Sequence, residues 1–360
     1  MRVRSALLGI TSAVTLTGAL LVPASVSDAS ATGHDHGHGH GHAPTTLREL
    51  AKKEHIKIGS AVDVTALANE ADYRAVLNRE FNNVTAENAM KWESVEPQQG
   101  VFDWSGADAI VASAKRNHQS IRGHNLVWHN QLPTWITSNE ANFTAAQLRT
   151  ILRDHIMTEA GRYRGKIRAW DVLNEAVNDG GGLRDTIWLR KLGPGYIADI
   201  FRWAHQADPH AKLYYNDYNL ESDQAKFDTM FQVVTDLRKH HVPIDGVGFQ
   251  GHLDIQFGFP DFAGHMKQVT DLGLEVAITE ADVRMILPVT PEKQATQASY
   301  YSQMMSACID NRRCTEFTTW GFTDRHQWVP GFFEGEGSAA LFDENLVPKP
   351  AYDALLALGK

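Results

Sequence analysis

The sequence predicts an α/β protein, most simply a closed (β/α)8 or TIM barrel in a single domain. From Thr45 onward, short apolar runs typical of buried strands alternate with stretches of helical periodicity. Eight such alternations over about 315 residues match the length of one barrel. A doubly wound open sheet is the alternative that the same alternation allows.

The predicted strands follow one another along the whole of this region. They cover residues 57–64, 81–88, 120–128, 167–175, 212–218, 246–252, 275–282 and 317–323. Residues 144–163 form a helix with Thr144 as N-cap and one apolar face of Leu148, Ile151, Leu152, His155 and Ile156. Residues 222–240 repeat this pattern with Ser222 as N-cap and a face of Phe227, Met230, Phe231, Val234 and Leu237. Residues 348–352 open a last helix, and residues 45–360 form the predicted catalytic domain.

The N-terminus has the pattern of a secretion signal over residues 1–31. Arg2 and Arg4 precede an apolar stretch, and Ala31 ends a small-residue run suited to cleavage. We expect export to the extracellular space, with a membrane anchor as the alternative. Residues 32–44 then form a flexible linker rich in histidine and glycine. Its histidines are able to bind zinc, nickel or copper, but we interpret it as a solvated linker and predict no catalytic metal.

The composition narrows the class of partner. The chain has 43% hydrophobic and 21% charged residues, as soluble globular proteins do. Its net charge of -9 argues against a nucleic-acid partner, because a phosphate-binding surface needs a basic excess.

Cys308 and Cys314 are the two cysteines of the chain, and in an exported chain they predict a local disulfide. After removal of the signal peptide, we expect the protein not to associate with a membrane.

Polar and aromatic side chains gather where the predicted strands end. In a barrel these ends form one rim, so segments distant in sequence would converge on it. Three tryptophans offer flat faces for sugar rings: Trp128, Trp320 and Trp328. Other side chains offer hydrogen bonds to hydroxyl groups: Glu87, Asn88, Lys91, His124 and Gln131. We interpret the convergence as an active site for a carbohydrate.

Two glutamates, Glu175 and Glu280, end the fourth and the seventh predicted strands. A pair of carboxyl groups facing each other suits cleavage of a glycosidic bond, with a separation of roughly 5–5.5 Å in retaining enzymes. Asp282 would orient His252, which would hydrogen-bond Glu280 and keep it ionised. Gln250 and His252 flank Gly251 on one strand, so their side chains should point to the same side.

Two segments resemble the signatures of glycoside hydrolase family 10, the (β/α)8 endo-β-1,4-xylanases. Residues 170–176, Trp-Asp-Val-Leu-Asn-Glu-Ala, resemble its acid/base signature, and residues 278–280, Ile-Thr-Glu, resemble its nucleophile signature. Further blocks match in the same order: residues 84–92, 122–135, 213–219, 246–253 and 320–324. The resemblance covers about residues 45–359.

This resemblance implies a secreted, monomeric endo-1,4-β-xylanase that cleaves internal bonds of xylan with retention of configuration and without a cofactor. Glu175 would be the acid/base, Glu280 the nucleophile, and Asn174 a contact to the sugar 2-hydroxyl. Gln250 would support Glu175, and His252 with Asp282 would support Glu280. The implied sugar contacts are Glu87, Asn88, Lys91, Gln131, Trp128, Trp320, Trp328 and, across the cleft, Tyr218. The family often carries a disulfide at the position of Cys308 and Cys314.

Three alternatives stay open on the sequence. A related retaining enzyme would act on another β-linked glycan or glycoside. A carbohydrate-binding barrel without activity would not need both carboxylates and their polar neighbours. A metal-dependent hydrolase would use the histidine run and would lose activity with a chelator.

Overall fold

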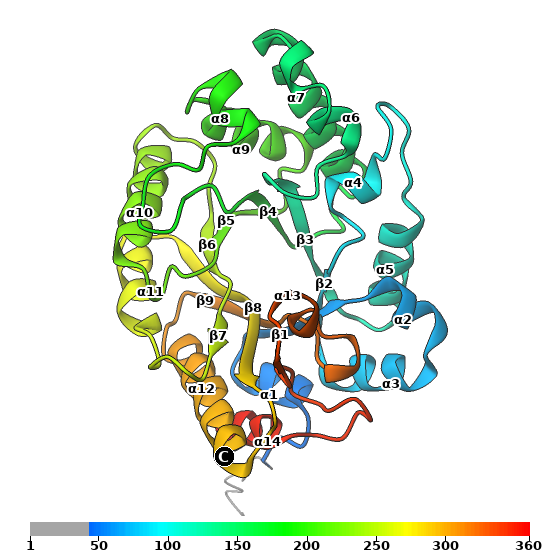
Figure 1. The fold of residues 1–360 in the computed structure, drawn as a ribbon, viewed down its shortest axis with the longest axis vertical. Coiled ribbons are helices and arrows are strands. Elements are labelled where there is room, and N and C mark those ends of the chain that lie inside the picture. Colours follow the sequence, from blue (N-terminus) through cyan, green and yellow to red (C-terminus); the bar gives the residue numbers. More distant parts are fainter. Residues whose placement is uncertain (1–42) are drawn as a thin grey trace, which may run out of the picture. The chain divides into compact units, whose positions relative to one another are not determined.

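The computed structural model describes residues 43–360, which form a closed barrel of eight parallel strands (Figure 1). In order around the ring these are β1 (Lys57–Val62), β2 (Asn83–Ala86), β3 (Ser120–Val127), β4 (Ala169–Asn174), β5 (Lys212–Asp217), β6 (Gly246–Phe249), β8 (Glu275–Ile286) and β9 (Cys314–Thr319). Each strand pairs in parallel with the next, and β9 pairs with β1. The ring therefore has no open edge, which confirms the predicted barrel and excludes the open sheet.

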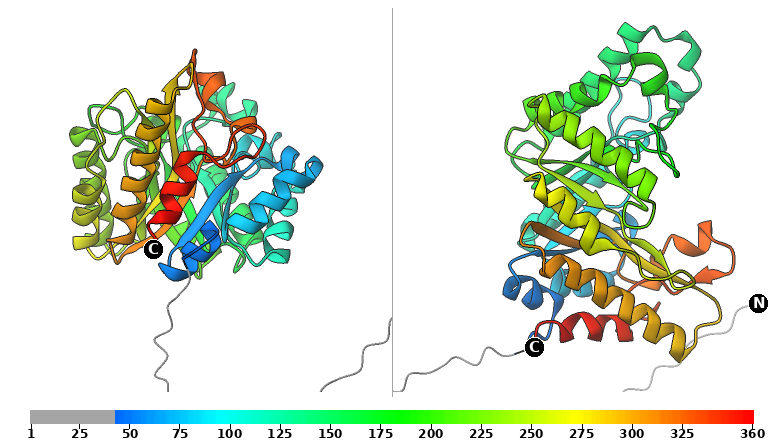
Figure 2. Two further views of the ribbon diagram at one scale, coloured as in Figure 1. Left: turned by 90° about the horizontal axis from the view of Figure 1, so that it is seen from below. Right: turned by 90° about the vertical axis from the view of Figure 1, so that its left-hand side faces the viewer.

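Long helices surround the barrel, and short helices lie in the loops that follow the strands (Figure 2). They are α1 (Leu47–Lys53), α2 (Val64–Asn69), α3 (Ala71–Glu80), α4 (Trp92–Val95), α5 (Ser105–Arg116), α6 (Thr134–Thr137), α7 (Ala145–Arg162), α8 (Ile187–Leu192), α9 (Tyr196–Ala207), α10 (Gln224–Lys239), α11 (Phe262–Asp271), α12 (Pro291–Ile309), α13 (Val329–Phe332) and α14 (Pro350–Ala357). Two short strands, β7 (His252–Asp254) and β10 (Glu336–Gly337), pair with the extended end of β8.

Every predicted strand is present, with bounds that differ by up to four residues, and two of the differences have a local cause. The run predicted at 246–252 is interrupted, because Gly251 adopts a φ of 78° between β6 and β7. The last barrel strand lies at 314–319 rather than 317–323. The start of this strand is polar, so it lacks the apolar run by which a buried strand is recognised. Its Glu316 is nevertheless buried inside the barrel, against Arg122.

One of the two predicted helix N-caps is present, and the other is not. Thr144 caps α7 and shares a capping box with Gln147, as the sequence indicates. The prediction of Ser222 for α10 is wrong, since Asp223 accepts the backbone N–H of Lys226. The Asp223 carboxylate also accepts the N–H of Gly180, so it anchors a neighbouring loop as well as the helix.

The predicted disulfide is present. Cys308 near the end of α12 is bonded to Cys314 at the start of β9, with a Cα–Cα distance of 5.2 Å. The predicted signal peptide at residues 1–31 and the linker as far as His42 lie outside the described residues. Within residues 43–360, every helix is too short or too polar to cross a membrane.

Candidate active site

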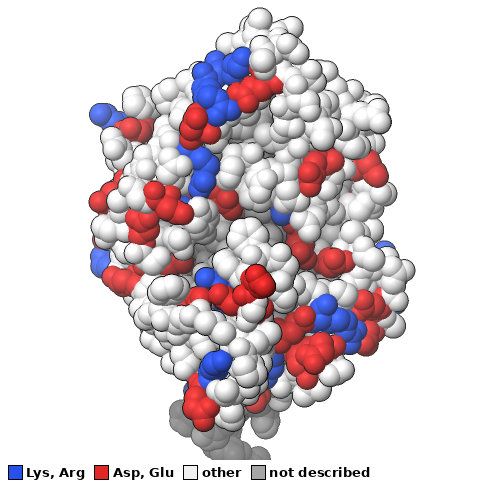
Figure 3. Space-filling view, in the orientation of Figure 1, with Lys and Arg blue, Asp and Glu red and all other residues white. Residues whose placement is uncertain are grey.

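The predicted site residues meet at the carboxyl ends of the barrel strands. Figure 1 is seen toward this end of the barrel, and Figure 3 shows the same face hollowed near its centre, with acidic side chains along parts of the edge. Glu175 directly follows β4, and Glu280 lies within β8. Because the ring is closed, strands distant in sequence place their ends around one depression.

Glu175 receives hydrogen bonds from neutral donors on three sides. Trp128 donates its indole Nε1–H to Oε2 at 2.8 Å. Gln250 donates to Oε1 at 3.0 Å, and the neighbouring Asn174 donates to the same oxygen at 3.3 Å. The backbone of Glu175 has a φ of 55°, a conformation that residues other than glycine seldom adopt.

Glu280 lies deeper and faces basic side chains. Asn216 donates to its Oε1 at 2.7 Å, and His252 Nε2 lies 3.3 Å from Oε2. His124 Nδ1 lies 3.9 Å from Oε1. Burial alone would raise the pKa of Glu280, but His124 and His252 hold it below its usual value. Glu280 is therefore kept as a carboxylate.

His252 stands between two carboxylates. Its Nδ1 lies 3.0 Å from Oδ2 of Asp282, and its Nε2 faces Glu280. Burial alone would lower the pKa of His252, yet Asp282 and Glu280 together raise it to about 10. Trp328 donates its Nε1–H to the same Asp282 oxygen at 2.7 Å, so Asp282 also fixes an aromatic wall of the site.

Two amide side chains connect the carboxylates. Asn216 Nδ2 donates both to Glu280 and, at 2.8 Å, to Oδ1 of Asn174. Asn174 in turn donates to Glu175. Thr279 donates to Oδ1 of Asn216 at 2.7 Å, which sets the orientation of that amide. One hydrogen-bonded group therefore fixes both glutamates relative to each other.

The predicted sugar contacts form a second group on the same rim. Lys91 Nζ donates to Asn88 at 2.9 Å and to Gln131 at 2.7 Å. It lies 5.1 Å from the ring centre of Trp128 and 5.9 Å from that of Trp320. Buried Lys91 is thus held by amides and aromatic faces, as a fixed donor for hydroxyl groups would be.

Two other predicted contacts border these residues. Glu87 follows β2, and burial together with Asp63 raises its pKa to about 7. Tyr218 follows β5, where its hydroxyl accepts a hydrogen bond from Arg184 at 2.9 Å and donates to Asp179 at 3.2 Å.

The structure gives the contacts of two predicted residues and adds residues that the sequence did not single out. Gln250 donates to Glu175 and His252 contacts Glu280, and Gly251, which has a positive φ, lies between them. Asn216 is not among the predicted site residues, although it contacts three members of the site. Its spacing, two residues before Tyr218 on an alternating strand, is the signal that could have indicated an inward side chain.

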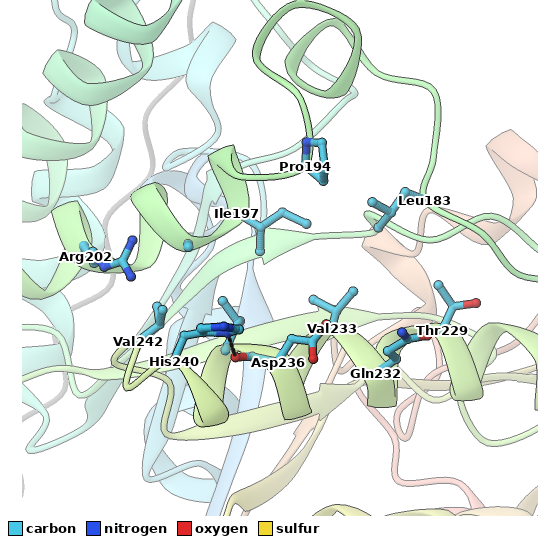
Figure 4. Close-up of a pocket in the computed structure, with 12 residues that line it drawn as sticks. Leu183, Pro194, Ile197, Arg202, Thr229, Gln232, Val233, Asp236, His240 and Val242 are labelled. Atoms are coloured by element: carbon cyan, nitrogen blue, oxygen red, sulfur yellow. Dashed lines mark hydrogen bonds between the residues drawn. The ribbon is translucent and has the colours of Figure 1, made fainter.

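A separate hollow of about 450 Å³ lies on the outside of the barrel between α9 and α10 (Figure 4). Leu183, Ile197 and Val233 supply apolar walls, and Arg202 and His240 lie among its polar residues. It contains none of the residues around Glu175 and Glu280. Glu175, Glu280 and their neighbours therefore lie outside this groove, at the carboxyl end of the barrel.

The chain has counterparts among known proteins. A family model described as Glycosyl hydrolase family 10 matches residues 46–358. The chain belongs to glycosyl hydrolase family 10. This confirms the resemblance seen in the two signature segments.

Individual members of family 10 are similar over most of their length. Endo-1,4-β-xylanase C of Phanerodontia chrysosporium is 42% identical over 315 residues, which cover 87% of this chain and 78% of that protein. Endo-1,4-β-xylanase B of Thermotoga neapolitana is 41% identical over 87% of this chain and 91% of that protein. The crystal structure of xylanase 10B from Thermotoga petrophila RKU-1 in complex with xylobiose matches with a TM-score of 0.84 and 41% identity, covering 89% of this chain and 99% of that one.

Proposed function

We propose that this chain is a secreted endo-1,4-β-xylanase that cleaves internal β-1,4 bonds of xylan by double displacement, with Glu280 as nucleophile and Glu175 as acid/base. The observation that carries the proposal is the pair of glutamates, Glu175 and Glu280, held in one hydrogen-bonded group but in different electrostatic surroundings. Family 10 membership and relatives named endo-1,4-β-xylanases support the reaction and its substrate class.

In the first step, the Glu280 carboxylate attacks the anomeric carbon while the bond from that carbon to the leaving oxygen breaks. The proton of Glu175 passes to the leaving oxygen, and a covalent glycosyl-enzyme results. In the second step, Glu175 takes a proton from water, and the resulting hydroxide displaces Glu280 from the sugar. The depressed pKa of Glu280 supports its assignment as the nucleophile, because attack requires the ionised form.

The neighbours of both glutamates have supporting roles in this scheme. Gln250 and Trp128 orient the Glu175 carboxyl group, while His252 and Asp282 keep Glu280 charged. Asn174 would donate to the sugar 2-hydroxyl, an interaction that strengthens in the transition state. The proposed sugar contacts at the rim are Glu87, Asn88, Lys91, His124, Trp128, Gln131, Tyr218, Trp320 and Trp328.

Export is part of the proposal. The charged and apolar segment at residues 1–31 is typical of a secretion signal, and a disulfide such as Cys308–Cys314 persists in oxidising compartments. The exported enzyme would then meet extracellular xylan or xylo-oligosaccharides as substrate. Solved relatives contain xylobiose or xylotriose. N-terminal sequencing of the exported protein tests this, with Thr32 expected as the first residue.

Product analysis tests substrate, endo action and stereochemistry together. Xylan is incubated with the enzyme in an NMR tube, and the anomeric protons are followed from the first minutes. We expect a mixture of oligosaccharides whose new reducing ends appear first as the β anomer. Initial appearance of the α anomer would refute double displacement. Faster hydrolysis of carboxymethylcellulose than of xylan would favour the related β-glycanase.

Variants of the two glutamates test the assigned roles. Glu280→Ala should lower xylan hydrolysis by more than about 1,000-fold, since no other group forms the covalent intermediate. Glu175→Ala should lower it by about 100- to 10,000-fold, the usual contribution of general acid catalysis. Azide should then restore activity of Glu175→Ala on an activated aryl xylobioside by replacing water. Unchanged hydrolysis by Glu280→Ala would contradict the mechanism.

A further inference from the structure

The loop after Glu175 is held firmly against the barrel. Val177 and Leu183 form an antiparallel bridge, so that residues 177–183 close into a small hairpin-like loop. Gly180, Gly181 and Gly182 all have positive φ values in its turn, and Gly181 has no room for a side chain beside Ala225. The N–H groups of Gly180 and Gly182 donate to Asp223 and Thr229 of the α10 region. The loop thus presents Arg184 from a fixed backbone.

Arg184 joins the backbone of Glu175 to the wall of the cleft. Its Nε donates to the carbonyl oxygen of Glu175 at 2.9 Å, and its Nη2 donates to Val177 at 3.1 Å and to the hydroxyl of Tyr218 at 2.9 Å. Its own backbone N–H donates to Ala176 at 2.7 Å. A planar guanidinium with several fixed donors makes such divergent contacts, which a lysine cannot reproduce.

Tyr218 is itself held on its other side. Lys226 Nζ lies 3.1 Å from the centre of the tyrosine ring, and the lysine side chain is fully buried. Its charge is balanced by Asp217 at 3.0 Å and by Asp179 at 3.1 Å. Asp179 also accepts from the Tyr218 hydroxyl. Arg184 therefore links Glu175 to a rigid support and not to a mobile surface side chain.

We propose that Arg184 is a positioning residue for proton donation, which couples the Tyr218 wall to the backbone of the acid/base Glu175. The proposal rests on the proposed function and goes beyond it. Glu175 occupies a left-handed conformation at the end of β4, so its carboxyl group stays in place only if the backbone around it is fixed. An acid displaced by a fraction of an ångström loses much of its effect on the leaving oxygen.

A series of aryl β-xylobiosides isolates this role. All aryl leaving groups occupy similar space, but 2,4-dinitrophenolate leaves without protonation and phenolate needs it. For Arg184→Met we expect kcat/KM to fall by less than about 3-fold with the dinitrophenyl substrate and by about 30-fold or more with the phenyl substrate. Arg184→Lys, which keeps the charge without the fork, should show the same selectivity. Tyr218→Phe, which removes the hydroxyl contact, should show a smaller selectivity of the same sign.

Arg190→Met is the matched control. Arg190 lies on the neighbouring α8, is exposed, and pairs with Glu140 and Asp185 away from Glu175. Its dependence on the leaving group should equal that of the wild type. Equal losses with all aryl substrates in both Arg184 variants, or no loss in either, would overturn the positioning role. If wild-type enzyme hydrolyses no xylobioside at all, the proposed function fails and this inference fails with it.

Discussion

At the scale of single residues, Glu175 and Glu280 differ in the charge of the groups that contact their carboxyl groups. Glu280 faces His252, whose pKa is raised to about 10, and also lies near His124. The carboxyl group of Glu175 accepts hydrogen bonds from uncharged indole and amide groups. Cations favour the ionised form of a neighbouring carboxyl group, whereas neutral donors act more weakly. The charged neighbours of Glu280 therefore support its proposed role as the nucleophile.

Replacing His252 tests this at a single position. His252→Asn removes a group that lowers the pKa of Glu280, so that pKa should rise. The acidic limb of kcat/KM reports protonation of the nucleophile, and it should therefore move to higher pH. The measurement is a pH–rate profile on xylotetraose. His240→Asn, an exposed histidine that contacts its own helix, is the control. An unchanged acidic limb in His252→Asn would show that the histidine does not set the charge of Glu280.

At the scale of elements, close packing between neighbouring strands depends on glycines that the hydrophobic pattern does not reveal. Gly123 on β3 lies against Trp170 on β4, where an added Cβ atom would come within 2.2 Å of the indole ring. Trp170 is fully buried, so it has no space to retreat. A large side chain of one strand therefore packs over a glycine of the next, on the face of the strands opposite to Arg122 and Asp171.

This contact predicts opposite effects for two glycine substitutions. Gly123→Ala should destabilise the protein by about 1–3 kcal/mol through overpacking. Gly161→Ala lies within α7, where a Cβ atom would contact nothing, and should stabilise it by up to about 1 kcal/mol. Urea unfolding followed by tryptophan fluorescence compares the two. Similar free energies of unfolding for both variants would contradict the packing argument.

At the scale of the whole molecule, a line of buried charges crosses the barrel interior from the active site. His124 Nδ1 lies 3.0 Å from Asp171, Arg122 contacts Asp171 through its Nε at 3.0 Å, and Arg122 also reaches Glu316 at 3.3 Å. Arg168 completes the line by pairing with Glu316. Burial alone would raise the pKa of Asp171, but Arg122 and His124 hold it below its usual value. Strands β3, β4 and β9 are thus joined electrostatically across the ring.

Arg122→Met should therefore be strongly destabilising. It leaves the buried Asp171 without its main partner, which typically costs about 3–5 kcal/mol. In the double variant with Asp171→Asn, the loss should be smaller than the sum of the two single losses, because the uncompensated charge is gone. Denaturant unfolding of all four proteins measures this coupling. Arg190→Met serves as the control, since its ion pair is exposed and contributes little. Additive losses would show that the pair is not coupled.

Local patterns in the sequence were sufficient to predict the alternation of strands and helices and to single out Glu175 and Glu280 as candidates. Alternating apolar and helical segments predict eight strands, and Glu175 and Glu280 directly follow or end such apolar runs. Thr144 was recognised as a cap because the capping box is a contact between residues three apart. These features depend on near neighbours along the chain, and the period of the hydrophobic pattern reports them directly.

The tertiary structure alone decided which polar groups meet. Gly251, with its positive φ, separates Gln250 from His252, and the two side chains contact different carboxylates. Asn216 and Arg184 gain their contacts only from the register of β5 beside β4 and from the folding of the loop after Glu175. A single charged residue such as Glu316 gives no local sign that it is buried, and closure of the ring places it beside Arg122. In each case the partner is distant in sequence, so closure of the barrel and its register determine the contact.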